Sequence, residues 1–210
     1  NTHFGFFTQE ALDEQVGIQG VELSKHGPSD DSLKLEPKFL PDVAPLTPDN
    51  PDSLQAECAN LPASAIRMID RINMFVPDGG FHGLGLVEAS KWVRPDEWFF
   101  KAHFLNDPVC PGSLGLEALI SIIKYMLLQR WPELAESHCF SLASDIKHAW
   151  TYRGQILPTN QVVQTQAVVT KMITDPLPRI WCDGLLSVDG LPIYEMKDFS
   201  IGLVPIAEGS

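Results

Sequence analysis

The stretch "HFLNDPVCPGSLGLEALISIIKYMLL", residues 103–128, decides the fold. It opens on a histidine, passes through a turn rich in proline and glycine, and continues as an apolar run with one carboxylate, Glu117. Apolar side chains occupy several faces of the helix expected over residues 113–130, which is more than an amphipathic stripe. A helix that is apolar nearly all round is buried, so this segment predicts a central core helix that ends at Trp131-Pro132.

Strand-like segments lie on both sides of this expected helix. Apolar patterns bounded by clusters of Gly, Pro and Asp predict them. The expected strands cover residues 65–76, 84–93, 141–152, 161–173, 179–190 and 191–204. The tripeptide "VDG" (188–190) predicts a hairpin turn, and "PDEWFF" (95–100) predicts a helical turn. This order predicts an α+β domain in which an antiparallel sheet wraps around one long buried helix.

The first sixty residues differ in composition from the rest of the chain. They hold eleven Asp or Glu against three Lys or Arg, and six of the 17 prolines lie within residues 27–52. Proline removes backbone donors and fixes φ, so residues 21–60 are expected to be extended and to lie against a surface. Residues 8–17 predict a short capped helix. We expect a Pro-rich acidic linker over residues 8–60 and a compact domain over 61–210.

Net charge and cysteine usage restrict the partners and the compartment. The formal net charge is −12, which argues against nucleic acid as a partner. The four cysteines form no CxxC pair and no signal peptide is evident, which predicts a reducing, cytoplasmic setting. No apolar run reaches the ~18 residues needed to cross a bilayer, so no membrane span is expected. The start at Asn1 predicts a fragment of a longer polypeptide.

Glu117 and His103 carry the chemistry expected of the quoted stretch. A carboxyl group in apolar surroundings resists ionisation, so Glu117 is suited to donate a proton near neutral pH. An imidazole has an unperturbed pKa of ~6.5, so His103 is suited to accept one. The turn leaves the amides of Gly112 and Ser113 free at a helix N-terminus, where they bind a carbonyl oxygen or oxyanion. A base, an acid and an oxyanion site fit a β-elimination next to a carbonyl.

Structural interpretations of the same residues stay open at this point. His103 is also explained as a core histidine bonded to a backbone carbonyl, and Glu117 as a partly exposed helix residue. Cys110 has apolar flanks and no neighbouring base, so it is assigned to the turn or to a channel wall rather than to a nucleophile. The pair His138-Cys139 is too small a cluster to predict a metal site.

The segment "WFFKAHFLNDPVCPGSLGLEAL" (98–119) resembles the active-site motif of the β-hydroxydecanoyl-acyl carrier protein dehydratases of type II fatty acid synthesis. That family shows a histidine, a D-P-V-x-P-G turn and an acid at the position of Glu117. Residues 66–72 resemble the family's first strand. Residues 152–159 resemble its G-Q-x-L-P-T segment, and residues 193–203 resemble its last strand. The resemblance covers residues 62–206 in order. It implies the hot-dog fold, a sheet wrapped around one long helix.

The resemblance implies roles for individual residues. His103 matches the catalytic base and Glu117 the catalytic acid of a hydro-lyase that converts 3-hydroxyacyl-acyl carrier protein to the trans-2-enoyl form. Gly112 and Ser113 match the amides that hold the thioester carbonyl. The residues expected to line an acyl channel are Phe104, Val109, Cys110 and Pro111. The decanoyl-specific enzymes usually carry Asp where Glu117 stands, so double-bond isomerisation is left open.

The resemblance also implies partners. In the family, the histidine and the acid of one site come from different subunits, so a second hot-dog domain is expected in a homodimer or a fused pseudo-dimer. The substrate is expected on the phosphopantetheine of an acyl carrier protein, with no bound cofactor and no metal. "HFGFF" (3–7) resembles the end of a hot-dog's last strand, so an upstream hot-dog is expected to end within residues 1–7. Such tandems point to a polyunsaturated fatty acid synthase in cytoplasmic lipid metabolism.

Two other functions fit a hot-dog domain. One is an acyl thioesterase, which would release a free thiol from its substrate. The other is a non-catalytic structural half of a tandem. A purely structural half has no need of both His103 and Glu117, so their presence argues against the second alternative. The sequence does not fix the acyl chain length or the surface that docks the carrier protein.

Overall fold

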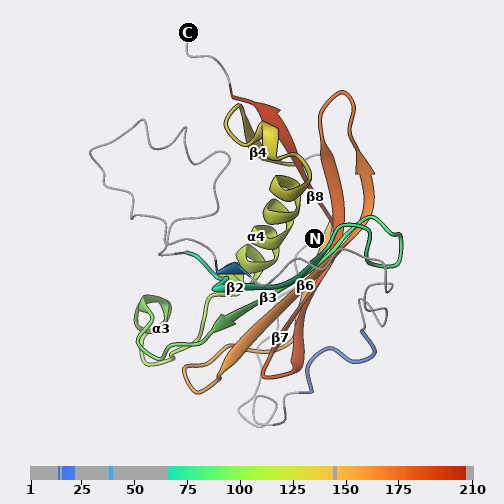
Figure 1. The fold of residues 1–210 in the computed structure, drawn as a ribbon. Helices are drawn as coiled ribbons and strands as arrows, with labels where there is room; N and C mark the ends of the chain where they lie inside the picture. Colours follow the sequence, from blue (N-terminus) through green and yellow to red (C-terminus); the bar gives the residue numbers. More distant parts are fainter. Residues whose placement is uncertain (1–13, 15, 22–37, 40–65, 144–145, 207–210) are drawn as a thin grey trace, which may run out of the picture.

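One curved antiparallel sheet and one long helix dominate the computed structural model, which describes residues 14, 16–21, 38–39, 66–143 and 146–206 (Figure 1). The helical elements are α3 (Trp98–Ala102), α4 (Gly112–Arg130) and the 3-10 turn η2 (Pro132–Leu134). The strands are β1 (Lys38–Phe39), β2 (Arg71–Val76), β3 (Leu86–Trp92), β4 (His138–Leu142), β5 (Ala149–Tyr152), β6 (Val162–Ile173), β7 (Arg179–Val188) and β8 (Leu191–Pro205).

The strands form one sheet in the order β1-β2-β3-β6-β7-β8-β4, and β5 also pairs with β8. β4 lies opposite residues 201–205 of β8, and β5 lies opposite residues 194–197. The single strand expected over residues 141–152 is therefore wrong. Six residues separate β4 from β5, whereas β8 advances by only three between the two pairings, so the two segments cannot continue one ladder.

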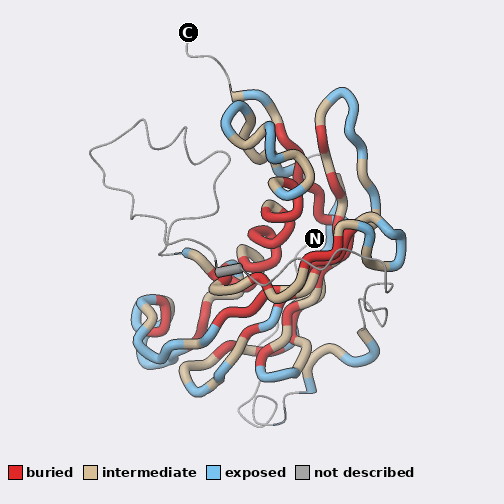
Figure 2. The backbone as a smooth tube through the Cα atoms, viewed as in Figure 1, coloured by how far each residue is buried: buried red, intermediate tan, exposed pale blue. Residues whose placement is uncertain are grey.

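The core lies between α4 and the sheet, where buried positions concentrate (Figure 2). α4 contacts β3, β6, β7 and β8. Every second residue of β7 is buried, as the two-residue period of a strand with one covered face requires. Among the fully buried helix side chains are Leu119, Ile122, Ile123 and Met126, and each contributes about 1.5–3 kcal/mol by leaving water. The predicted α+β fold with one buried central helix is confirmed.

α4 is long and apolar enough to cross a membrane by length and composition alone, with a mean hydropathy of 1.2 over 18 residues. The expectation that no such run exists is therefore wrong. In the structure, 61% of that window is buried inside the protein, which is the position of a core helix. Among the described residues no other helix meets the same criteria.

The hairpin turn between β7 and β8 follows the sequence prediction. Asp189 and Gly190 have φ values of 48° and 85°, the positive values that a two-residue type I′ turn requires. The Asp189 carboxylate accepts hydrogen bonds from the amides of Gln161 and Val162 and from the side chain of Asn160, at 2.9–3.2 Å. The turn is thereby attached to the start of β6.

The N-terminal part of the chain is described only in short pieces. β1 pairs with β2 at an edge of the sheet, and the Ile18 N–H donates to the Pro192 carbonyl at 2.8 Å. The strand expected from residue 65 begins only at residue 71. The expected end of an upstream hot-dog at 1–7 lies outside the described residues. So do most of the helix expected at 8–17 and most of the linker, and the domain boundaries stay a prediction.

Candidate active site

His103 lies at the end of α3. Its backbone N–H donates to the Phe99 carbonyl at 3.0 Å. The buried side chains of Phe99 and Phe100 hold α3 against the core. The imidazole is half-buried, and its Nδ1 lies 3.1 Å from the carbonyl oxygen of Val109. A carbonyl oxygen only accepts hydrogen bonds, so in the neutral ring this contact places the hydrogen on Nδ1 and the lone pair on Nε2. The backbone bond expected of a structural histidine is present, yet the ring is not enclosed in the core.

A buried ion pair holds the start of α3. Lys91 Nζ, from β3, lies 2.8 Å from Glu97 Oε1, and the two side chains are only 4% and 9% exposed. Glu97 is the N-cap residue of α3, and Arg94 Nε lies 3.5 Å from the same carboxylate oxygen. The pair therefore connects the sheet to the helix that ends at His103. The sequence analysis did not identify it.

The turn at residues 103–111 is hydrogen-bonded to residues 152–159, a second segment that resembles the dehydratase family. The Cys110 N–H donates to the carbonyl of the buried Ile156 at 2.9 Å. Pro111 is half-buried and is the N-cap residue of α4, with φ −54° and ψ 133°. Because this backbone conformation is not helical, α4 begins at Gly112.

Gly112 and Ser113 begin α4, as the sequence predicts. The first N–H groups of a helix have no partner within the helix. Among the described residues, neither amide donates to a backbone carbonyl, whereas the Leu114 N–H donates to the Pro111 carbonyl at 3.0 Å. Two free donors therefore lie at the positive end of a 19-residue helix, where a negatively charged oxygen is stabilised.

Glu117 lies on a partly open stripe of α4, with 22% of its side chain exposed. The Ser121 hydroxyl donates to Glu117 Oε1 at 3.3 Å, and Lys124 Nζ lies 3.5 Å from the same oxygen. The expected carboxyl group enclosed by apolar side chains is therefore wrong, and the partly exposed alternative holds. Both contacts use Oε1, so Oε2 is not engaged by the described residues.

The two candidate acid–base groups do not contact each other within one chain. The polar contacts of His103 are with Phe99 and Val109, and those of Glu117 are with Ser121 and Lys124. No hydrogen bond or ion pair joins His103 to Glu117 in the part of the chain that the structure describes. Both residues lie in one continuous segment, but the chain by itself does not pair them.

The residues expected along an acyl channel differ in exposure. Phe104 is 54% exposed, and its ring lies beside that of His103 with centroids 4.0 Å apart. Val109 and Cys110 are buried. Burial, reinforced by the negative charge of Glu97, raises the pKa of the Cys110 thiol to about 12. It therefore stays protonated at neutral pH and is no nucleophile. The acyl channel expected to be lined by Phe104, Val109, Cys110 and Pro111 stays a prediction.

An aromatic cluster that the sequence analysis did not identify packs against the first turn of α4. Trp150 and Tyr152 come from β5 and Tyr194 from β8. The Tyr194 ring centroid lies 4.7 Å from that of Tyr152 and 5.8 Å from that of Trp150. A Cβ atom on Gly115 would lie 1.8 Å from Tyr194 Cε2, so only glycine fits there. The register that places Tyr152 opposite Tyr194 has no sequence signal.

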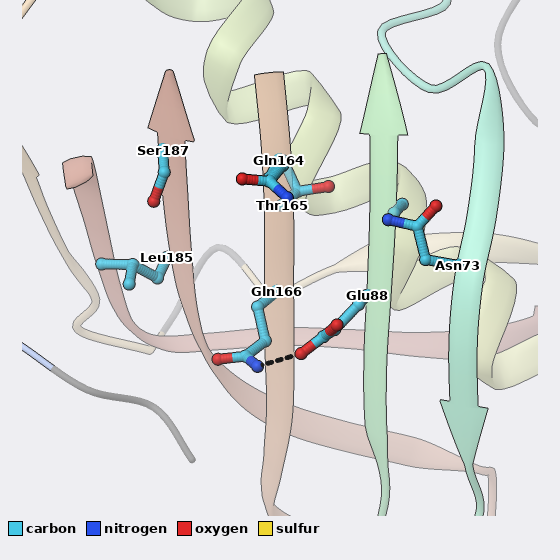
Figure 3. Close-up of a pocket in the computed structure, with 8 residues that line it drawn as sticks. Asn73, Glu88, Gln164, Thr165, Gln166, Leu185 and Ser187 are labelled. Atoms are coloured by element: carbon cyan, nitrogen blue, oxygen red, sulfur yellow. Dashed lines mark hydrogen bonds between the residues drawn. The ribbon is translucent and has the colours of Figure 1, made fainter. Parts of the chain in front are cut away.

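A polar hollow of about 180 Å³ lies on the sheet, away from these residues (Figure 3). Side chains from β2, β3, β6 and β7 line it, and Gln166 Nε2 donates to Glu88 Oε1 at 2.5 Å. Gln164 and Gln166 alternate along β6 with the buried Val163, Thr165 and Ala167. The glutamines therefore face away from the core, and the hollow contains none of the expected site residues.

Comparisons with known proteins agree with this architecture. A family model described as a FabA-like domain matches residues 61–197. The solved dehydratase heterocomplex ApeI:P from Xenorhabdus doucetiae is similar in structure, with a TM-score of 0.51 and 12% identity, over 73% of this chain and 93% of that chain. A hypothetical thioesterase with coenzyme A from Streptococcus pneumoniae TIGR4 is more distant. Its TM-score is 0.40 at 7% identity, over 59% of this chain and 81% of that chain.

The curled sheet around α4 and the similarity to the Xenorhabdus structure show the hot-dog fold, as the motif resemblance implies. At 12% identity this similarity supports the fold and nothing further. The family match is the stronger finding, because it covers well over half of the chain and includes the whole segment from His103 to Glu117. The chain belongs to the FabA-like family.

Proposed function

We propose that this chain dehydrates 3-hydroxyacyl thioesters to trans-2-enoyl thioesters in fatty acid synthesis, as a hydro-lyase. Membership of the FabA-like family supports a dehydratase-type role. One observation carries the finer assignment: His103 Nδ1 is bonded to the Val109 carbonyl, which leaves Nε2 as a base in the segment that opens α4.

The proposed reaction moves two protons. His103 Nε2 accepts the C2 proton of the substrate, and the electrons of the C2–H bond form an enolate with the thioester carbonyl. These electrons then form the C2=C3 double bond as the C3–O bond breaks. Glu117 donates its proton to the leaving oxygen, so water departs and the 2-enoyl thioester remains. His103 then loses its proton to solvent and Glu117 regains one, which restores both groups.

The N-terminus of α4 stabilises the charge that develops on the thioester oxygen. In this proposal the Gly112 and Ser113 amides donate to the carbonyl, whose oxygen becomes negative as the C2 proton leaves. Removing one donor from such a site typically costs ~10²–10³ in kcat. The helix dipole acts in the same direction, because its positive end faces the oxygen.

The acid role of Glu117 uses one carboxyl oxygen. Oε1 is held by Ser121 and Lys124, so Oε2 is the oxygen available to carry the transferred proton. The Glu117 side chain is partly exposed, which is consistent with this role.

We also propose that a second hot-dog domain completes the site, either in a homodimer or in a fused pseudo-dimer. The absence of a contact between His103 and Glu117 within the described residues supports this arrangement. In this proposal the substrate is presented on the phosphopantetheine of an acyl carrier protein. The domain belongs to a cytoplasmic polyunsaturated fatty acid synthase. The acyl channel is lined by Phe104, Val109, Cys110 and Pro111.

Water loss from a 3-hydroxyacyl N-acetylcysteamine thioester tests the function. The ultraviolet absorbance of the conjugated enoyl product follows the reaction. We expect His103→Ala and Glu117→Gln each to lower kcat at least about 100-fold, since each removes one proton-transfer group. Turnover close to wild type in either variant would sink the mechanism.

A thiol-reactive dye in the same assay separates dehydration from thioester hydrolysis. A dehydratase leaves the thioester intact, so no free thiol should appear. Thiol release without enoyl formation would identify a thioesterase instead. Absence of both products, when the complete tandem is active, would identify a structural half.

A further inference from the structure

The hydroxyl group of Tyr194 is buried without a hydrogen bond to any described residue. The side chain is 0% exposed, so no bulk water satisfies the group. The Tyr152 hydroxyl is a weak hydrogen-bond partner of the Tyr194 phenol, and their rings meet edge to face, but the two hydroxyls do not reach the distance and angle of a full hydrogen bond. An unpaired buried hydroxyl destabilises a fold, whereas phenylalanine would fill the same space without that loss. The hydroxyl therefore needs an explanation beyond packing.

This hydroxyl lies against the first turn of α4. A Cβ atom on Gly115 would lie 2.7 Å from the Tyr194 oxygen, and one on Gly112 would lie 3.8 Å from it. Both glycines belong to the turn whose free amides face the proposed substrate carbonyl. A hydroxyl donor and the free amide donors are thus gathered at one helix terminus.

Trp150 connects this place to the protein surface. Trp150 is 39% exposed, and its ring lies 3.5 Å from the position of a Cβ on Gly112. The same ring meets Tyr194 edge to face. The cluster therefore extends from the protein surface to the buried hydroxyl along the first turn of α4.

We propose that the Tyr194 hydroxyl donates a hydrogen bond to the carbonyl oxygen of the bound acyl thioester, as a third donor beside the Gly112 and Ser113 amides. The proposal rests on the proposed function. Hydroxyl groups and backbone amides both serve as donors in sites that stabilise a developing oxyanion. The positive end of the helix attracts the same oxygen.

The protonation state of Tyr194 suits this role. Burial, together with the nearby Tyr152 and Cys110, raises the pKa of the Tyr194 phenol well above its usual value. The phenol therefore keeps its proton across neutral pH and remains a donor. An enolate oxygen accepts more strongly than the ground-state carbonyl, so the bond acts mainly on kcat.

Tyr194→Phe in the full chain is the direct test. We expect kcat/KM toward the 3-hydroxyacyl N-acetylcysteamine thioester to fall about 100-fold, chiefly through kcat. We expect the Tm to stay equal or rise, because the unpaired hydroxyl is gone. Unchanged kinetics would overturn the proposal, and so would a loss of activity that only accompanies a fall in Tm.

Thr165→Val is the matched control. Thr165 lies on β6, and its hydroxyl is also buried without a hydrogen bond among the described residues. It lies outside the proposed site. Its removal should leave kcat and KM unchanged while the Tm stays equal or rises. Equal losses of activity in both variants would contradict a specific role for Tyr194.

Binding measurements separate this inference from the proposed function. Calorimetry of Tyr194→Phe with hexanoyl N-acetylcysteamine thioester and its 3-hydroxy counterpart should show about 2- to 3-fold weaker binding of both, because both carry the carbonyl and the bond to the ground-state carbonyl is the weaker one. Weaker binding of the 3-hydroxy compound alone would place the hydroxyl at C3 and overturn the inference. If the wild type does not dehydrate, the proposed function fails, but the binding of the hexanoyl compound still decides whether Tyr194 contacts the carbonyl.

Discussion

Two lysine–glutamate pairs lie near the candidate site and differ in distance and burial. Lys91 Nζ and Glu97 Oε1 are 2.8 Å apart on side chains that are 4% and 9% exposed. Lys124 Nζ and Glu117 Oε1 are 3.5 Å apart on side chains that are 19% and 22% exposed. A buried pair is expensive to break, since it leaves an uncompensated charge, whereas a partly exposed pair exchanges with water at little cost. The first pair is suited to hold α3, and the second to release a carboxyl group for chemistry.

Glu97→Gln should have the largest effect on stability. It leaves the Lys91 ammonium buried, with Asp70 at 4.0 Å as a remaining carboxylate. We expect the free energy of unfolding to fall by about 3–5 kcal/mol, measured by urea denaturation. Glu117→Gln is the matched control and should change it by less than about 1 kcal/mol. Equal losses in the two variants would remove the distinction between the pairs.

The double substitution Lys91→Met, Glu97→Gln sharpens this point. It removes the stranded charge and replaces it with an apolar side chain. We expect the double variant to regain at least about 1–2 kcal/mol relative to Glu97→Gln alone in the same urea experiment. The single variant Lys91→Met completes the comparison. If the loss in free energy of unfolding of the double variant equals the sum of the losses of the two single variants, the two groups do not interact as a pair.

Asp189 offers a third arrangement, a carboxylate held by N–H donors. Partial desolvation raises its pKa, but the hydrogen bonds from Val162, Asn160 and Gln161 outweigh this and lower it. Because the folded-state pKa is depressed, the stabilisation is present above the unfolded value of ~3.9 and disappears as pH falls through the folded value. Asp189→Asn should cost no more than about 0.5–1 kcal/mol at pH 7 in urea unfolding, because solvent screens the exposed carboxylate.

The pH dependence of that difference is the check. Asn tolerates the positive φ at position 189, so the substitution changes the charge and leaves the turn conformation intact. The gap between Asp189→Asn and wild type should close as the pH is lowered below about 4. A gap that is constant across this range would mean that the carboxylate charge contributes nothing.

Lys124→Met should have the smallest effect on stability, below about 0.5 kcal/mol, because its ion pair is partly exposed. Its effect on activity should be larger. Without Lys124, one contact that orients Glu117 Oε1 is lost, and we expect kcat to fall about 10-fold with little change in KM. Lys124→Arg should restore most of the rate, since it keeps the charge. Loss of stability in proportion to activity would indicate a structural role instead.

The fold was predictable because its signals are local. The apolar run of α4, the strand patterns of β6 and β7 and the Asp189-Gly190 turn each lie within a few consecutive residues. The motif around His103 is equally local, since its imidazole bonds to a carbonyl six residues away. Such features need no knowledge of which distant segments meet.

Most of the remaining features depend on tertiary contacts, which local sequence patterns do not predict. One of them, the partial exposure of Glu117, has a local pattern in the sequence. The contact of Tyr194 with Gly115 joins β8 to α4, and no periodicity indicates it. The break between β4 and β5 follows from their register with β8. The open position of Glu117 did have a signal, because Ser121 and Lys124 recur at helical spacing and mark a polar stripe in an otherwise apolar helix.

The close approach of Tyr194 to Gly115 also constrains how this domain can evolve. A side chain at position 115 has no room unless the ring at position 194 shrinks or moves, so the two positions can change only together. Among homologues, we expect a tyrosine at position 194 to occur with glycine at position 115. Sequences that carry alanine or a larger residue at 115 should carry a smaller residue at 194.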